Sequence, residues 1–181
     1  MALLNSPSTY GSITKWLHWI LAVCVIVMLI LGALMGYAHG TFRSELYQIH
    51  KSLGLTVLFL FIARILWHRI SPTPRLPSSL ASWEKTLAKT VQVSLYVSLI
   101  LMPLSGWAMS VASYRPPSFW GWFTLSLPIK PNPYFAEVLQ QAHSIIAWVI
   151  IALLALHIAG AIKHQWVQHD DVLKRMLPCL P

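Results

Sequence analysis

Histidine is the residue type whose positions in this chain point most directly to chemistry. The sequence holds eight histidines and five carboxylates, and no carboxylate lies inside a long apolar stretch. Histidine inside such a stretch is costly and usually functional. Proton relays and sites for Mg²⁺, Ca²⁺ or non-haem iron use carboxylates, so the pattern disfavours them. Imidazole without carboxylate or thiolate suits haem iron held by two axial histidines.

The spacing of two histidines predicts two such sites. His143 and His157 are 14 residues apart. Over 14 residues a helix rotates to about 40° short of four full turns, so both side chains point to the same side. The same 14 residues span about 21 Å along the helix axis, so the two histidines lie at different depths. The hydrocarbon core of a bilayer is about 30 Å thick, which places one histidine near each end of it. Each site then needs a second histidine from another helix.

Matching depth predicts the partners. His18 lies one turn inside the first apolar stretch, at the depth of His157, and His50 opens the second stretch, at the depth of His143. We therefore predict that His18 and His157 bind the iron of an inner haem. His50 and His143 are predicted to bind the iron of an outer haem.

A second pairing, His68 with His164, also agrees with helical spacing, because each lies a whole number of turns from a histidine of the first pairing. It would separate the two sites by about 31 Å, the whole hydrocarbon thickness, and push the inner haem into the headgroups. We favour the first pairing and expect His68 and His164 to reach the cytoplasmic interface. His39 and His169 are expected in loops.

Four apolar stretches must position these histidines, and lipid leaves the backbone of each no alternative to an α-helix. They cover residues 14–36, 46–68, 90–114 and 138–164, the second being the weakest by hydropathy. They predict one domain over residues 1–181, an all-α membrane protein built as a four-transmembrane-helix bundle that encloses two haems. The third stretch has no histidine, so we expect it to contribute packing, with a kink at Pro103.

Composition agrees with a membrane protein. The chain is 56% hydrophobic and 10% charged, against about 25% charged in soluble domains. A soluble enzyme and a disordered chain are therefore excluded. The net charge of +8 reflects membrane orientation rather than nucleic-acid binding, because the cations lie between apolar stretches. The two cysteines, Cys24 and Cys179, form no CxxCH motif, so covalent c-type haem attachment is not expected.

The distribution of lysine and arginine predicts that both termini are cytoplasmic. With that orientation, four cations lie outside: Arg43, Lys51, Arg115 and Lys130. Nine lie inside: Lys15, Arg64, Arg69, Arg75, Lys85, Lys89, Lys163, Lys174 and Arg175. Arg43 and Lys51 are candidate partners for the propionates of the outer haem, and Lys15, Arg64 and Lys89 for those of the inner haem.

Two connections stand out. Residues 71–77 are rich in proline and predict a stiff cytoplasmic link. Residues 115–133 join the last two helices and are rich in proline and aromatic residues. We interpret this segment as an interfacial aromatic belt, with a lid over the outer face as the alternative.

The order of short motifs resembles the bacterial cytochrome b561 family across nearly the whole chain. The first stretch opens with Trp16-Leu17-His18-Trp19, and the second with Ile49-His50-Lys51-Ser52-Leu53-Gly54. Arg64 and the proline-rich link follow, and the fourth stretch carries Ala142-His143 and Leu156-His157. The specificity lies in the order and spacing of these motifs.

The resemblance implies a multi-pass protein of the bacterial inner membrane with two non-covalent b-type haems, each held by two histidines. The family's ligands correspond to His18, His50, His143 and His157. The resemblance also implies electron exchange with the quinone pool, with ubiquinone as acceptor and superoxide as a proposed periplasmic donor. That would make the protein a quinone-linked oxidoreductase. No comparable motif marks a quinone or donor site.

Two other functions share part of this pattern. A dihaem anchor subunit would collect electrons for quinone from a larger respiratory dehydrogenase or hydrogenase. A small transporter would use its membrane histidines to bind a metal or move protons. An anchor would purify with a soluble partner, and a transporter would lack the strong visible bands of haem.

Overall fold

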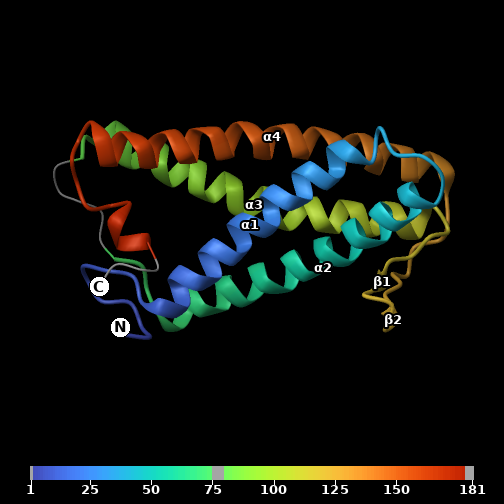
Figure 1. Cartoon of the computed structure of the whole chain (residues 1–181), viewed down its shortest axis with the longest axis horizontal. Helices are drawn as coiled ribbons and strands as arrows, with labels where there is room; N and C mark the ends of the chain where they lie inside the picture. The colour runs from blue at the N-terminus through green and yellow to red at the C-terminus, as the bar shows by residue number, and fades with distance from the viewer. Residues whose placement is uncertain (1, 75–79, 178–181) are drawn as a thin grey trace.

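Four long helices make up the fold in the computed structural model, which describes residues 2–74 and 80–177 (Figure 1). They are α1 (Ser12–Leu34), α2 (Gly40–Ile70), α3 (Ser82–Ala112) and α4 (Pro133–Trp166). Each is long and apolar enough to cross a membrane. The prediction of an all-helical chain with four potential membrane spans is confirmed, apart from the two-residue strands β1 (Ser118–Phe119) and β2 (Phe123–Thr124).

All four helices begin earlier than predicted: α1 by two residues, α2 by six, α3 by eight and α4 by five. Hydropathy marks the part of a helix that fits in lipid, whereas backbone hydrogen bonding continues into the polar residues beyond it. The start of α4 shows the local cause. The Asn132 side chain accepts a 3.1 Å hydrogen bond from the Phe135 amide, and Pro133 occupies the first position, where its missing N–H costs nothing.

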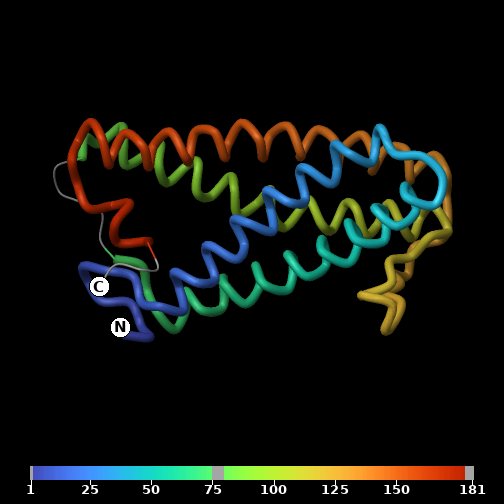
Figure 2. Tube along the Cα trace, viewed as in Figure 1, coloured from blue at the N-terminus to red at the C-terminus, as the bar shows by residue number. Residues whose placement is uncertain are grey.

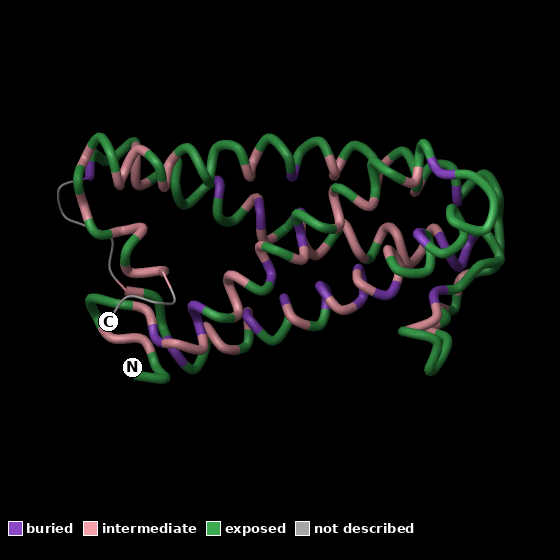
Figure 3. Tube along the Cα trace, in the orientation of Figure 1, coloured by how far each residue is buried: buried purple, intermediate pink, exposed green. Residues whose placement is uncertain are grey.

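The helices pack unevenly along the elongated bundle. Close backbone contacts join α3 to α4, α1 to α2 and α2 to α3. Figure 2 shows α1 running obliquely across the view while α4 runs along the length of the bundle. Most of α4 is exposed, and buried positions gather on α2 (Figure 3). The exposed apolar surface is what lipid covers in a membrane protein.

An apolar cluster fills the middle of the bundle. It contains Leu21 and Val25 from α1, Val57 and Phe61 from α2, and Ile150 from α4. On α4, this layer lies halfway along the 14 residues that separate the two histidines singled out above. It therefore divides the interior into two levels.

The two ends of the bundle differ, and we name them by their segments. The terminal end holds residues 2–11 and the short 3₁₀ helix η1 (Lys174–Met176), whereas the loop end holds residues 113–132 (Figure 1). At the terminal end, the Asn5 side chain accepts hydrogen bonds from the Gly11 amide and the Thr14 hydroxyl, both 2.8 Å, and donates one to the Ser71 carbonyl. These bonds tie the start of α1 to the end of α2.

A second set of polar contacts joins α3 to α4 at the same end. Glu84 forms an ion pair with Lys163 and accepts a 2.9 Å hydrogen bond from the Gln168 amide group. The Lys163 ammonium also lies 5.1 Å from the centre of the Trp83 ring. Part of the proline-rich link, including Arg75 and Pro77, lies outside the described residues, as does Cys179.

At the loop end, β1 and β2 form a short antiparallel hairpin that lies along α2. Ser52 donates a 2.9 Å hydrogen bond to the Ser118 carbonyl, and the Trp120 indole donates one of 3.1 Å to Thr56. The hairpin thus follows α2 away from the loop end, with Trp122 80% exposed. An exposed tryptophan here fits an interfacial belt.

Candidate functional site

Two histidines face each other at the terminal end of the bundle. His18 comes from α1 and His157 from α4, with ring centroids 6.2 Å apart and ring planes at 62°. His18 also contacts the edge of the neighbouring Trp19 ring at a centroid distance of 5.6 Å. The Trp19 indole donates a 2.9 Å hydrogen bond to the Met176 carbonyl, which holds the C-terminal segment against α1.

A second pair lies toward the loop end. His50 comes from α2 and His143 from α4, with ring centroids 6.4 Å apart and ring planes at 68°. Helix α4 therefore contributes one imidazole to each pair, and two different helices supply the others. The structure brings together the same two pairs that the spacing predicts, while their role as ligands stays a prediction.

The separation within each pair fits one metal ion between two imidazoles. A histidine nitrogen binds a metal at about 2 Å and its ring centre lies about 1 Å further away, so two opposed imidazoles have centres about 6 Å apart. In the described part of the chain, no group of three or more His, Cys, Asp and Glu side chains is placed to hold a metal. Two facing imidazoles suit an iron whose other ligands come from a non-protein group, as in haem.

Helix α3 contacts His143 through two adjacent residues. Ser105 Oγ lies 2.9 Å from His143 Nδ1. A Cβ atom added at Gly106 would lie 2.9 Å from His143 Cε1. From the sequence, only packing and a kink at Pro103 are predicted for this part of α3. A serine beside a glycine in an apolar helix was the available signal, but small residues also favour ordinary helix contact.

The histidines of the alternative pairing have other partners. His68 Nε2 lies 3.1 Å from the Tyr96 hydroxyl, and their rings stack. His164 Nδ1 lies 2.7 Å from an Asp170 carboxylate oxygen. His39 precedes the first residue of α2 and His169 follows α4, both exposed. These four histidines therefore lie outside the two facing pairs.

Cations lie near both levels. Arg64 is 7% exposed, and its guanidinium donates a 3.4 Å hydrogen bond to the Thr14 carbonyl. Among the described residues no carboxylate forms an ion pair with it. Toward the loop end, Lys51 follows His50 in sequence and donates a 2.9 Å hydrogen bond to the Arg115 carbonyl. A buried cation without a carboxylate fits an anionic group supplied from outside the chain.

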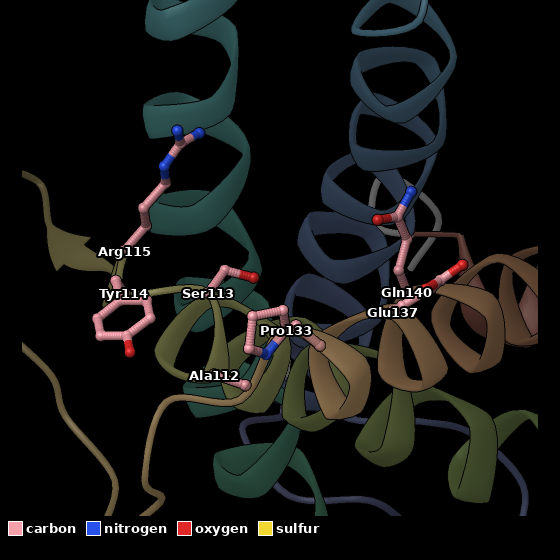
Figure 4. Close-up of a pocket in the computed structure, with 8 residues that line it drawn as sticks. Ala112, Ser113, Tyr114, Arg115, Pro133, Glu137 and Gln140 are labelled. Carbon is pink, nitrogen blue, oxygen red and sulfur yellow. The ribbon is translucent and has the colours of Figure 1, made fainter.

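A hollow of about 360 Å³ opens at the loop end, where α3 ends and α4 begins. Figure 4 shows Arg115 on one side of it, Glu137 and Gln140 on the other, and Pro133 between them. No histidine lines this hollow. It is separate from the facing histidine pairs.

Comparison with known proteins gives consistent matches over almost the full length. The prokaryotic cytochrome b561 family matches residues 9–179. Cytochrome b561 homolog 2 of Escherichia coli (strain K12) is 32% identical over 180 residues, covering 98% of this chain and 95% of that protein. Cytochrome b561 homolog 1 of the same organism is 29% identical over 166 residues, covering 90% and 93%.

A third relative carries a name that states an activity. The probable superoxide oxidase CybB of Yersinia pestis is 28% identical over 171 residues, covering 93% of this chain and 96% of that protein. The family match and the four helices long and apolar enough to span a membrane agree with each other. The chain therefore belongs to the prokaryotic cytochrome b561 family, whose members are b-type membrane cytochromes that transfer electrons.

Proposed function

We propose that this protein is a dihaem cytochrome that carries electrons across the bacterial inner membrane from a periplasmic donor to quinone. The observation that supports this most directly is the two facing histidine pairs, with ring centroids 6.2 and 6.4 Å apart. Both separations match two imidazoles on one iron. Haem b, when bound, supplies reversible one-electron chemistry at each pair.

His18 and His157 hold one haem in this proposal, and His50 and His143 hold the other. The apolar cluster around Ile150 separates the two levels. Each level lies seven residues of α4 from Ile150, a rise of about 10 Å. The cluster excludes water between the sites, so electrons pass through a dry interior of low dielectric constant.

We place the terminal end in the cytoplasm. Eight of the nine cations predicted to lie inside are in the described residues, in or close to the segments at this end. This orientation makes His18 and His157 the inner pair and His50 and His143 the outer pair. Arg64 is buried near the inner level and holds a propionate there.

Superoxide is the donor we favour, because one relative is named a probable superoxide oxidase. Lys51 follows His50 in sequence and donates a hydrogen bond to the Arg115 backbone carbonyl. The positive charges of these two residues attract a small anion to this end of the bundle. Two superoxide ions lose two electrons and become two molecules of oxygen. One ubiquinone takes up those two electrons with two protons and becomes ubiquinol.

The first test is the haem content of the purified full-length protein. We expect strong visible absorption bands and two haems per chain, extractable in acidic acetone because neither is covalently attached. Addition of superoxide should reduce the protein, and superoxide dismutase should prevent this. A colourless protein would contradict the proposal and favour the transporter.

The second test separates a free-standing enzyme from the anchor subunit of a dehydrogenase or hydrogenase. In a mild detergent, the free-standing protein should purify without a soluble subunit and reduce a soluble ubiquinone analogue when superoxide is supplied. Co-purification of a soluble dehydrogenase, together with no reduction by superoxide, would favour the anchor function.

A further inference from the structure

The Ser105 hydroxyl lies between two groups at hydrogen-bond distance. Its Oγ is 2.8 Å from the Met102 carbonyl oxygen and 2.9 Å from His143 Nδ1. A carbonyl oxygen can only accept, and serine has a single hydroxyl proton. The hydroxyl proton therefore goes to Met102, and Oγ accepts a hydrogen bond from His143 Nδ1–H, which the Met102 carbonyl also lies close enough to share.

This direction of the bond selects one tautomer of His143. A neutral imidazole carries one proton, so a proton on Nδ1 leaves the lone pair on Nε2 free to bind iron. The opposite tautomer would carry its proton on Nε2 and could not act as a ligand there. Donation from the second ring nitrogen also raises the basicity of a ligating histidine.

The neighbouring residue restricts where the ring can lie. A Cβ atom at position 106 would lie 2.9 Å from His143 Cε1 and 3.3 Å from Nδ1. Such close approach is possible only for glycine. Gly106 thus lets the His143 ring pack against α3, and Ser105 forms the hydrogen bond to its Nδ1 atom.

The facing imidazole lacks this support. His50 Nδ1 is buried and has no hydrogen-bond partner in the described part of the structure. The closest atom to a Cβ added at Gly32, on α1, is His50 Cε1 at an ordinary 3.7 Å. Among the described residues, a side chain therefore hydrogen-bonds the Nδ1 atom of His143 but not that of His50.

We propose that Ser105 is a positioning residue that holds His143 in the Nδ1–H tautomer and lowers the midpoint potential of the outer haem. This rests on the proposed function, because it requires His143 to bind iron. A more basic ligand stabilises the ferric state relative to the ferrous state. Helix α3 then tunes one haem although it supplies no ligand.

The test is a redox titration of purified full-length variants together with their haem-to-protein ratio. In Ser105→Ala we expect one of the two midpoint potentials to rise while the other stays unchanged, and the affinity for one haem to fall about tenfold. Ser105→Thr keeps the hydroxyl and should restore the wild-type values. Ser98→Ala removes a buried hydroxyl from the same helix, seven residues away, and should change neither potential.

Three results would overturn the inference. They are unchanged potentials and haem content in Ser105→Ala, a shift of both potentials together, or a Ser105→Thr variant that behaves like Ser105→Ala. The last would mean that the site responds to packing and not to the hydroxyl. If the wild-type protein itself binds fewer than two haems, the proposed function fails instead. The haem-to-protein ratio of the wild type therefore distinguishes failure of the proposed function from failure of the role of Ser105.

Discussion

His143 and His157 lie on the same face of α4, and each meets an imidazole from a different helix, at centroid separations of 6.4 and 6.2 Å. One helix thus links both levels of the bundle. A tilt or rotation of α4 would change both separations together, which makes its placement the main geometric requirement of the site. The contacts of α3 with α4 restrain that movement.

We expect alanine substitution of either histidine in a pair to remove the same haem. His18→Ala and His157→Ala should each leave one haem per chain with the same remaining midpoint potential. His50→Ala and His143→Ala should leave the other haem, with a different potential, because the haem at the altered level would lose one of its two histidine ligands and be bound more weakly. Haem-to-protein ratios and redox titrations measure this.

The controls for that series are His68→Ala and His164→Ala, which should keep both haems because these residues contact Tyr96 and Asp170 instead. Loss of a haem from His68→Ala with retention of both in His18→Ala would favour the alternative pairing.

We expect Gly106→Ala to disturb the loop-end pair alone. The new methyl carbon would lie 2.9 Å from His143 Cε1, so the ring must move away from α3 and from its partner. Overpacking of this kind costs about 1–3 kcal/mol, enough to weaken haem binding at that level by about fivefold to a hundredfold. The haem-to-protein ratio after gel filtration reports it.

Gly32→Ala is the matched control, since its new Cβ would meet His50 only at 3.7 Å. This variant should retain both haems. Equal loss of haem from Gly32→Ala and Gly106→Ala would show that general helix packing, and not the contact with His143, causes the loss.

We expect Arg64→Gln to lower the midpoint potential of the haem at the terminal end. Removal of a buried positive charge destabilises the reduced haem, which carries one more electron. Arg69→Gln removes an exposed cation from the same end of α2 and should leave the potential nearly unchanged. A redox titration in which the two variants behave alike would argue against a specific role for Arg64.

We expect Asn5→Ala to destabilise the fold without altering either haem. The Asn5 side chain bonds to Gly11, Thr14 and Ser71, and its loss leaves half-buried donors without partners at about 1–3 kcal/mol. Thermal unfolding in detergent should show a lower midpoint than for the wild type or for the exposed Ser8→Ala control. An unchanged midpoint would mean that the N-terminal segment does not stabilise the bundle.

We expect both termini in the cytoplasm. Reporter fusions after Arg75 and after Pro181 should give cytoplasmic signals, and a fusion after Lys130 a periplasmic signal, because cations concentrate toward the terminal end. The reverse pattern would exchange the inner and outer labels of the two histidine pairs but leave the pairs themselves intact.

Properties that depend on one helix could be predicted from the sequence. The apolar stretches predicted four helices, and helical periodicity predicted that His143 and His157 share a face. Depth alone then predicted that His18 faces His157 and that His50 faces His143. These inferences succeed because rise and rotation per residue are constants of the helix and because the bilayer sets a common depth scale.

Apart from the two histidine pairs, contacts between helices were decided only by the tertiary structure. Ser105 and His143 are 38 residues apart, and no periodicity within either helix shows that they meet. Their contact depends on the rotation and crossing of α3 and α4, which arise from packing along their whole lengths. Three other features were likewise not predictable from the sequence: the buried position of Arg64, the hairpin along α2 and the early helix starts. Each depends on neighbours that are distant in sequence or on polar residues that hydropathy does not register.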